Sequence, residues 1–315
     1  MLARLQQVVV LVSAGAGLAW VLLSLRAGWG PWWAAAGLLL AALPMAPVLA
    51  LEFLLLAAFG RDASVPRASA VQLLRAWAGE VWASWRVFSR DQPFFADAEP
   101  DVPGMAGRTG VLLVHGYFCN RGIWRPWLRR LRASGVPCTA LTLAPAFGSI
   151  DDWAPAIDAA VARLRLDTGR APVVVAHSMG GLAVRAWLAG ASAAARPGLR
   201  RVITIATPHQ GTWMARFGHS RNARQMRSGQ AWLSGLGAAE LAAGLATPPA
   251  AAAAGQRAGF TCFYSHADNI VFPAATATLA GADNRHLPAV AHVAMVQHPA
   301  VWAELQRWLD EPAPA

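Results

Sequence analysis

The sequence contains no lysine, so every one of its 27 basic side chains is an arginine. Charge is scarce in general: 14% of the 315 residues are charged, whereas 56% are hydrophobic. A soluble protein of ordinary composition carries about 25% charged residues. This shortage argues against a chain that is wholly exposed to water and indicates that part of it lies in lipid.

Cysteine is equally scarce, with only Cys119, Cys138 and Cys262 in the chain. An odd number of widely separated cysteines indicates neither a disulfide framework nor a cysteine metal cluster. We therefore expect no metal site.

The net charge of +10 would suit either a nucleic acid or an anionic membrane surface. The arginines form no run with interleaved aromatic residues, and the sequence has no recognisable nucleic-acid-binding motif or zinc-finger spacing. A nucleic-acid partner is therefore not expected. The membrane bilayer is the better partner, because the arginines are scattered whereas the apolar residues are concentrated.

That concentration lies at the N-terminus. Residues 8–25 carry no charge and are about long enough to cross the core of a bilayer, and residues 33–59 form a second apolar run. The loop 26–32 between them has two tryptophans beside glycine and proline, a composition typical of a turn at a membrane interface. We predict a membrane anchor of two transmembrane helices over residues 1–60.

The second run contains Pro44, Pro47 and one acid, Glu52. A charged side chain at the bilayer centre costs about 2.5–3.5 kcal/mol on insertion scales, which several leucines can offset. Alternatively, Glu52 lies near the end of a shorter span, and we assign it no function. The first run has one alternative, a cleaved signal peptide, but its small residues 13–16 lie inside the apolar stretch instead of after it.

Residues 61–108 are predicted to hold an amphipathic helix and a linker. Apolar side chains recur at spacings of three and four over residues 71–88, at Leu74, Trp77, Val81, Trp85 and Phe88, with Arg75, Glu80 and Arg86 elsewhere. Such a helix either lies in the membrane interface or packs on the domain that follows. The acidic, proline-bearing stretch 91–108 reads as the linker.

From residue 109 the sequence alternates strands with helices, which predicts an α/β fold with a mostly parallel sheet and helices on both faces. Strands are expected at 110–114, 139–143, 173–177, 201–205 and 260–265, within a domain that extends to residue 311. Residues 211–258 give no strand signal and predict a helical cap over the carboxyl edge of the sheet. The alanine-rich piece 239–254 of this cap is expected to be mobile.

One strand runs directly into a serine. The three valines 173–175 suit a central parallel strand, and a well-packed helix follows Ser178. Ala176 and Gly180, two residues before and after the serine, are small enough for a sharp, strained strand-to-helix turn. Ser178 is therefore the candidate nucleophile, the alternative being a serine that only caps the helix.

A serine nucleophile needs oxyanion donors and an acid that orients its base. The strand 110–114 ends in His115-Gly116-Tyr117, so the amide of Tyr117 is one candidate donor, and the amide of Met179 is the other. Asp268 follows the carboxyl end of the strand 260–265, where the acid belongs. Asp283 is the alternative acid, and a turn-forming aspartate is the alternative role for Asp268.

Eight histidines compete for the role of the base. Six fit less well: His115, His177 and His209 belong to strand-end motifs, His219 lies in the predicted cap, His266 is too close to the acid and His286 precedes a proline turn. Of the remaining two, we prefer His292, which follows an expected last strand at 288–291. The alternative is His298, at the final helix.

The order Ser178, Asp268, His292, together with several motifs, resembles the α/β-hydrolase superfamily, specifically its bacterial lipase and esterase branch. The motifs are His115-Gly116-Tyr117, Ala176-His177-Ser178-Met179-Gly180-Gly181, the Thr-Pro-His-Gln-Gly-Thr segment 207–212, the acid loop 265–273 and His292-Val293-Ala294. Two departures are Ala176 in place of the commoner glycine and Ala291 before the histidine.

The resemblance implies a nucleophile at Ser178, a general base at His292, an acid at Asp268 and oxyanion donors at Tyr117 and Met179, with no cofactor. A membrane-anchored serine hydrolase that cleaves carboxylic esters, of lipids or long acyl chains, is then expected. The alternatives are an acyltransferase with the same triad, and a non-catalytic membrane scaffold.

The arginines also predict an orientation. Arg4 precedes the first apolar run, the loop has only Arg26, and Arg61, Arg67 and Arg75 follow the second run. This excess predicts that both ends face the inside. The catalytic domain would then lie in the cytoplasm at a bacterial inner membrane, with the periplasm as the alternative.

Overall fold

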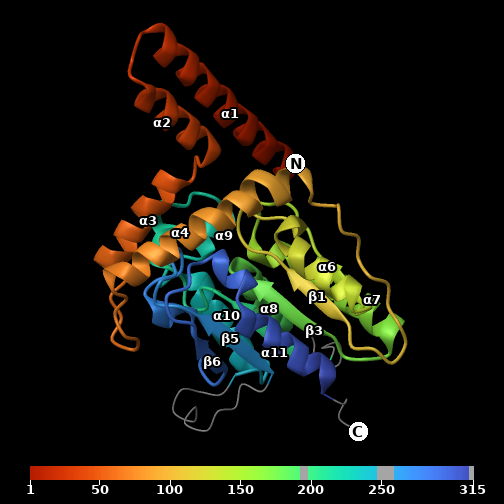
Figure 1. The fold of residues 1–315 in the computed structure, drawn as a ribbon. Coiled ribbons are helices and arrows are strands. Elements are labelled where there is room, and N and C mark those ends of the chain that lie inside the picture. The colour runs from red at the N-terminus through yellow and green to blue at the C-terminus, as the bar shows by residue number, and fades with distance from the viewer. Residues whose placement is uncertain (192–197, 247–258, 312–315) are drawn as a thin grey trace.

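The computed structural model describes residues 1–191, 198–246 and 259–311. Its centre is a parallel sheet, six-stranded within these residues, in the order β2-β1-β3-β4-β5-β6 (Figure 1). The strands are β1 (Val111–Val114), β2 (Cys138–Ala140), β3 (Val173–His177), β4 (Arg201–Ile205), β5 (Phe260–Tyr264) and β6 (Asp283–His286).

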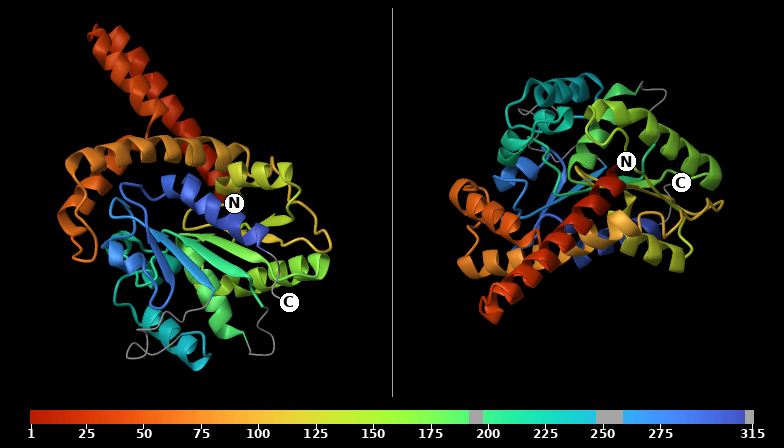
Figure 2. Two further views of the ribbon diagram at one scale, coloured as in Figure 1. Left: turned by 60° about the horizontal axis from the view of Figure 1, so that its bottom comes forward. Right: turned by 90° about the horizontal axis from the view of Figure 1, so that it is seen from above.

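Helices cover both faces of this sheet, which confirms the predicted α/β fold (Figure 2). On one face lie α6 (Arg125–Ala133) and α11 (Pro299–Asp310), and on the other α7 (Ala154–Thr168), α8 (Met179–Gly190) and α10 (Ala231–Ala242). Alternate strand residues enter the two cores: Val111 and Leu113 pack on the first face, and Leu112 and Val114 on the second. The central strands are therefore apolar throughout, as a parallel sheet buried on both sides requires.

The last strand differs from the prediction. We expected it at the apolar residues 288–291, but the structure places it at β6, whose sequence is Asp-Asn-Arg-His. This strand pairs with β5 alone, at the edge of the sheet, so its side chains need not be apolar. Residues 288–291 form a turn instead, in which Ala289 has a φ of 57°.

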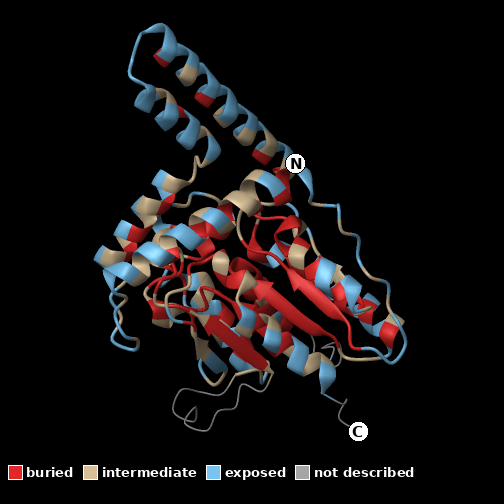
Figure 3. Cartoon of the chain, viewed as in Figure 1, coloured by how far each residue is buried: buried red, intermediate tan, exposed pale blue. Residues whose placement is uncertain are grey.

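At the N-terminus, α1 (Leu2–Arg26) and α2 (Pro31–Ala42) form a hairpin that projects away from the sheet (Figures 1 and 2). The two helices approach closely because Gly17 and Gly37 have no side chain: a Cβ at Gly17 would lie 2.0 Å from that of Ala41. Most of the hairpin's apolar side chains are exposed (Figure 3). By length and composition, α1 could cross a membrane.

The second apolar run is not one straight helix. It is divided into α2 and α3 (Ala46–Phe59), which are bent by 75° relative to each other. Pro44 explains the break, because proline cannot donate the helical hydrogen bond and disfavours a helical conformation at Leu43 before it. A second transmembrane helix is therefore a prediction that depends on whether the bent pair forms one span.

Beyond the break, α3 and α4 (Ala70–Arg86) turn back and pack on the loops that follow β5 and β6. The most buried residues of α4 are Ala76, Glu80 and Ser84, whereas the predicted apolar stripe is half-buried except at Leu74. Leu74 and Trp82 are 64% and 61% exposed. The helix thus contacts the domain while an apolar surface on it remains uncovered.

The stretch 211–246 is helical, with η4 (Trp213–Phe217), α9 (Arg221–Gln225) and α10. Residues of η4 and α9 line a cavity at the carboxyl edge of the sheet. In contrast, α10 packs on α8, where Glu240 pairs with Arg185 at 2.7 Å. Half of the alanine-rich piece expected to be mobile, residues 247–254, lies outside the described residues.

Candidate active site

Ser178 lies at the turn between β3 and α8 with φ 53° and ψ −130°, a strained backbone conformation for a residue with a side chain. Its amide donates to the carbonyl of Ile205 on the neighbouring strand, at 2.7 Å. Small neighbours make the turn possible: a Cβ at Gly180 would lie 2.5 Å from the carbonyl oxygen of His115, and one at Gly116 would lie 2.7 Å from Ser178 Cβ.

Three residues that are far apart in the sequence meet at this turn. His292 Nε2 lies 3.0 Å from Ser178 Oγ, and His292 Nδ1 lies 3.0 Å from both carboxylate oxygens of Asp268. All three side chains are buried. The loops after β5 and β6 bring the acid and the histidine to the serine, so a hydrogen-bonded chain runs from Ser178 through His292 to Asp268.

The acid is itself held in place. Asp268 Oδ1 accepts hydrogen bonds from the amides of Ile270 and Val271 at 2.9 and 2.8 Å. Burial disfavours the charged form of His292, but the charge and the hydrogen bond of Asp268 outweigh it and raise the pKa of His292 above its ordinary value. The histidine is therefore a stronger base than one buried without a carboxylate partner.

The alternative acid and base lie elsewhere. Asp283 is in β6, where it pairs with Arg285 at 2.7 Å. His298 accepts a hydrogen bond from the amide of Ala300 at 3.2 Å and caps the N-terminus of α11. Neither contacts Ser178.

Two further histidines support the site without joining the chain. His177 Nε2 donates to the carbonyl of His292 at 3.3 Å, and the two rings lie 4.8 Å apart. His115 Nε2 accepts from the amide of Leu143 at 2.9 Å. Burial lowers the pKa of His115 to about 4 and that of His177 well below its ordinary value, so both are neutral and position the backbone.

The predicted oxyanion donors flank the serine. Met179 follows it at the start of α8, and Tyr117 follows the glycine whose Cβ position faces Ser178. Within the described residues, neither of these two backbone amides donates a hydrogen bond to the protein. Both are therefore free to bind an oxygen atom.

A cavity of about 280 Å³ opens beside Ser178 and His292. Its walls are mostly apolar, and they come from three parts of the chain. The cap provides Met214, Ala215, Ala223 and Met226, the acid loop provides Ile270 and Val271, and the N-terminal helices provide Met45, Leu49, Glu52, Glu80, Ser84 and Phe88. This cavity is thus built partly by residues that precede the sheet.

The sequence did not identify two of these residues, Glu52 and Glu80, as part of the site. Glu52 was considered only as an acid in or near the membrane, and Glu80 as part of a polar helix face. Both contact the loops that carry the triad: Glu52 accepts from Asn269, and Glu80 from the amides of Val293 and Ala294. The sequence signal that could have indicated a role at the site is that each helix carries a single acid among apolar residues.

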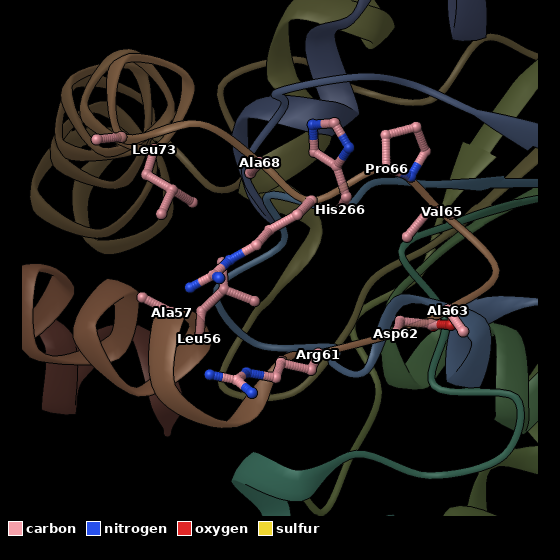
Figure 4. A pocket seen from close by; sticks show the side chains of 13 residues that line it. Leu56, Ala57, Arg61, Asp62, Ala63, Val65, Pro66, Ala68, Leu73 and His266 are labelled. Carbon is pink, nitrogen blue, oxygen red and sulfur yellow. The ribbon is translucent and has the colours of Figure 1, made fainter.

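A larger cavity, of about 670 Å³, lies between the end of α3 and the start of α4 (Figure 4). Arg61, Asp62 and His266 are among its lining residues, whereas Ser178, Asp268 and His292 are not. Despite its size, it is not where the reacting groups meet. Among the described residues there is also no group of three or more His, Cys, Asp or Glu side chains arranged to hold a metal ion.

Comparisons with known proteins agree with this architecture. The chain is similar in structure to the mature lipase BlEst2 of Bacillus licheniformis, at 15% sequence identity and a TM-score of 0.53 over 67% of this chain and 95% of that one. It is also similar to lipase B of Aspergillus fumigatus, at 20% identity and a TM-score of 0.55 over 67% and 54%. At these identities the similarity establishes the fold alone.

No curated protein matches the sequence. A model of the alpha/beta hydrolase family, however, matches residues 111–313, which is more than half of the chain. This segment includes all six strands described above and Ser178, Asp268 and His292. The chain belongs to the alpha/beta hydrolase family.

Proposed function

We propose that this protein is a serine hydrolase that cleaves carboxylic esters through an acyl-enzyme. The observation that carries the proposal is the continuous hydrogen-bonded chain from Ser178 Oγ through His292 to Asp268. This arrangement provides a nucleophile, a general base and an acid that fixes the imidazole tautomer.

In the proposed reaction, His292 Nε2 takes the proton of Ser178 as its Oγ attacks the ester carbonyl. Asp268 accepts a hydrogen bond from the Nδ1–H of the imidazole and stabilises the imidazolium that forms. The amides of Tyr117 and Met179 bind the oxyanion of the tetrahedral intermediate. His292 then protonates the leaving alcohol, and water, activated by the same histidine, releases the acid.

We further propose that the substrate is a lipid or a long-chain acyl ester. The apolar cavity supports this, since it would accept an acyl chain, and α3 and α4 form part of its wall. Those helices follow directly on an exposed apolar hairpin. A substrate dissolved in the bilayer would reach Ser178 along this side of the molecule.

Membrane attachment through two spans is part of the same proposal, with the catalytic domain on the cytoplasmic face of a bacterial inner membrane. One contact supports a retained anchor over a cleaved signal peptide: Gln6 of α1 is buried and donates to the carbonyl of Phe118, at 3.1 Å, beside Tyr117. Fusion of reporters after Ala315 tests the orientation. Green fluorescent protein should be bright and alkaline phosphatase inactive; the reverse would place the site in the periplasm.

The proposed reaction is tested with nitrophenyl esters of increasing chain length and with triacylglycerols. Activity should rise with acyl length until the cavity is filled. Ser178→Ala should abolish hydrolysis, by about 10⁴-fold or more in kcat, with an unchanged unfolding temperature. Retained hydrolysis by this variant would refute the assignment of the nucleophile.

A further inference from the structure

Two carboxylates, one buried and one half-buried, reach the catalytic loops from outside the segment that matches the hydrolase family. Glu52 lies on α3 and Glu80 on α4, whereas the family match begins at residue 111. Both line the same cavity as Ser178 and His292. Neither belongs to the triad, so their position beside it calls for a physical reason.

Glu80 holds the backbone that directly follows the base. Its Oε1 accepts from the amide of Val293 at 2.8 Å, and its Oε2 from the amide of Ala294 at 2.9 Å. These amides open the short helix η7 (Ala294–Gln297), whose first turn has no internal partners for them. Glu80, 1% exposed, therefore caps this helix from a different part of the chain and fixes the exit of the chain from His292.

Glu52 holds the other catalytic loop. Its Oε2 accepts from Asn269 Nδ2 at 2.6 Å, and Asn269 directly follows Asp268. With its amino group on Glu52, Asn269 presents Oδ1 to the amide of His292, at 3.3 Å. One carboxylate on α3 thus orients a side chain that links the acid loop to the base loop.

We propose that Glu52 and Glu80 are positioning residues. Through them, the geometry of the triad depends on α3 and α4 being packed against the loops that carry Asp268 and His292. The proposal rests on the esterase function above and assigns to the N-terminal helices a role in the same site. When these helices are packed against the domain, Glu52 and Glu80 fix both loops. When they are displaced, Asp268 and His292 lose the contacts that fix their backbones.

The charges around His292 give this proposal a pH signature. Asp268, Glu80 and Glu52 act on His292 as anions, and neutral His177 contacts it. Burial raises the pKa of Glu80 to about 7, so above that pH Glu80 is an anion that favours the imidazolium form of His292. Replacing Glu80 by glutamine removes one anion, which disfavours the imidazolium and moves the acid limb of the kcat/KM profile to lower pH.

The raised pKa of Glu80 also allows an effect on activity to be distinguished from an effect on stability. The folded protein binds the Glu80 proton more tightly than the unfolded chain, so this group favours folding below about pH 4.5, and the contribution is lost as the pH rises through about 7. At pH 8, Glu80→Gln removes a buried charge. The removal of this buried charge offsets the lost hydrogen bonds. The unfolding temperature of Glu80→Gln should therefore stay within about 4 °C of the wild type.

The test uses the full-length protein and a soluble short-chain nitrophenyl ester. In Glu80→Gln, kcat should fall about 10- to 100-fold with KM within about threefold, since the base is misplaced while the cavity is intact. The acid limb should move to lower pH. In Glu80→Asp, which keeps the charge but is too short to reach both amides, kcat should fall with the limb near its wild-type position.

Glu304→Gln is the matched control. Glu304 is also buried and hydrogen-bonded, to Thr261 and Trp308, but it does not line the active-site cavity. It should lower the unfolding temperature and leave the pH profile unchanged. If Glu80→Gln does not fold, Glu52→Gln and Glu52→Ala serve instead, with the larger loss of kcat in the alanine variant, which leaves Asn269 without an acceptor.

A wild-type kcat and pH profile in folded Glu80→Gln would overturn the positioning role while leaving the esterase assignment in place. A wild-type protein that hydrolyses no ester would instead overturn the proposed function itself. The two failures are therefore distinguishable.

Discussion

The family-matched segment and the N-terminal segment of this protein bury their apolar residues in different ways. In the segment that begins at Val111, strands alternate between two cores and the central sheet is almost fully covered. In residues 1–60, α1 and α2 leave most of their leucines and tryptophans uncovered, and only α3 turns an apolar face inward (Figure 3).

This difference separates two tasks. The family-matched segment supplies every residue of the proposed triad, on loops fixed by a rigid sheet. The N-terminal segment provides an exposed apolar surface and forms part of the wall of the active-site cavity. Experiments that alter one segment and leave the other intact can therefore test this division.

The largest effect is expected from the base. His292→Ala should lower kcat by about 10⁴-fold, because no other side chain of the described residues lies within hydrogen-bond distance of Ser178 Oγ. His298→Ala is the matched control: it should leave kcat unchanged and cost about 1 kcal/mol of stability through loss of the α11 cap. Kinetics and thermal unfolding of both variants decide the assignment, and the reverse pattern would refute it.

The acid should come next. Asp268→Asn should lower kcat by up to about 10⁴-fold with little change in KM, because the imidazole tautomer is no longer fixed while substrate contacts remain. Asp283→Asn removes a surface partner of Arg285 and should be nearly neutral. If Asp283→Asn proved the more damaging variant, the acid would have to be reassigned.

Truncation tests the N-terminal segment at two points. Deleting residues 1–42 removes the hairpin but keeps α3 and α4, so kcat/KM on a soluble ester should stay within about tenfold of the wild type, the two lost hydrogen bonds of Gln6 and Gln7 being worth about 1 kcal/mol each. Activity on membrane-dispersed lipid should fall much further. Deleting residues 1–60 also removes Leu49 and Glu52 from the cavity and should damage both activities.

Equal losses on both substrates in the shorter deletion would mean that the hairpin supports folding, or that the substrate is not in the membrane. Circular dichroism of each truncated protein separates these two outcomes.

The smallest effect is expected on the outer face of α4. Leu74→Ser and Trp82→Ser should lower activity on lipid vesicles a few-fold and leave soluble-ester kinetics unchanged, because a side chain that only partly enters the interface contributes a fraction of the about 1.5–3 kcal/mol that full burial is worth. Leu166→Ser, on α7 and 81% exposed, is the control and should change neither activity. Vesicle flotation provides a direct measure of binding, and unchanged flotation in the α4 variants would remove this face from the membrane contact.

The sequence was sufficient to predict the centre of the fold because the local signals there are strong. Three consecutive valines favour a buried strand, because β-branched side chains pack well in a sheet. The turn at Ser178 requires small residues around it, because a larger side chain there would clash with the backbone. The candidates for acid and base could be chosen by chain order, although His292 lies 114 residues after Ser178.

Other features could not be predicted, for identifiable reasons. The edge strand β6 is polar because a single neighbour covers it, so it carries no apolar pattern. Glu80 has the appearance of a surface charge, since its burial depends on backbone amides more than 200 residues later in the chain. Glu52 lies in an apolar run and gives no sign that its helix bends toward the acid loop.

The most direct test of the central claim is covalent labelling with a fluorophosphonate, followed by digestion with trypsin. Trypsin cuts this lysine-free chain at arginine, and the peptide 171–185 contains one hydroxyl side chain, that of Ser178. The account predicts that the label is found on this peptide in the wild type, is absent in Ser178→Ala and is strongly reduced in His292→Ala. Label on any other peptide, or undiminished labelling of Ser178→Ala, would contradict it.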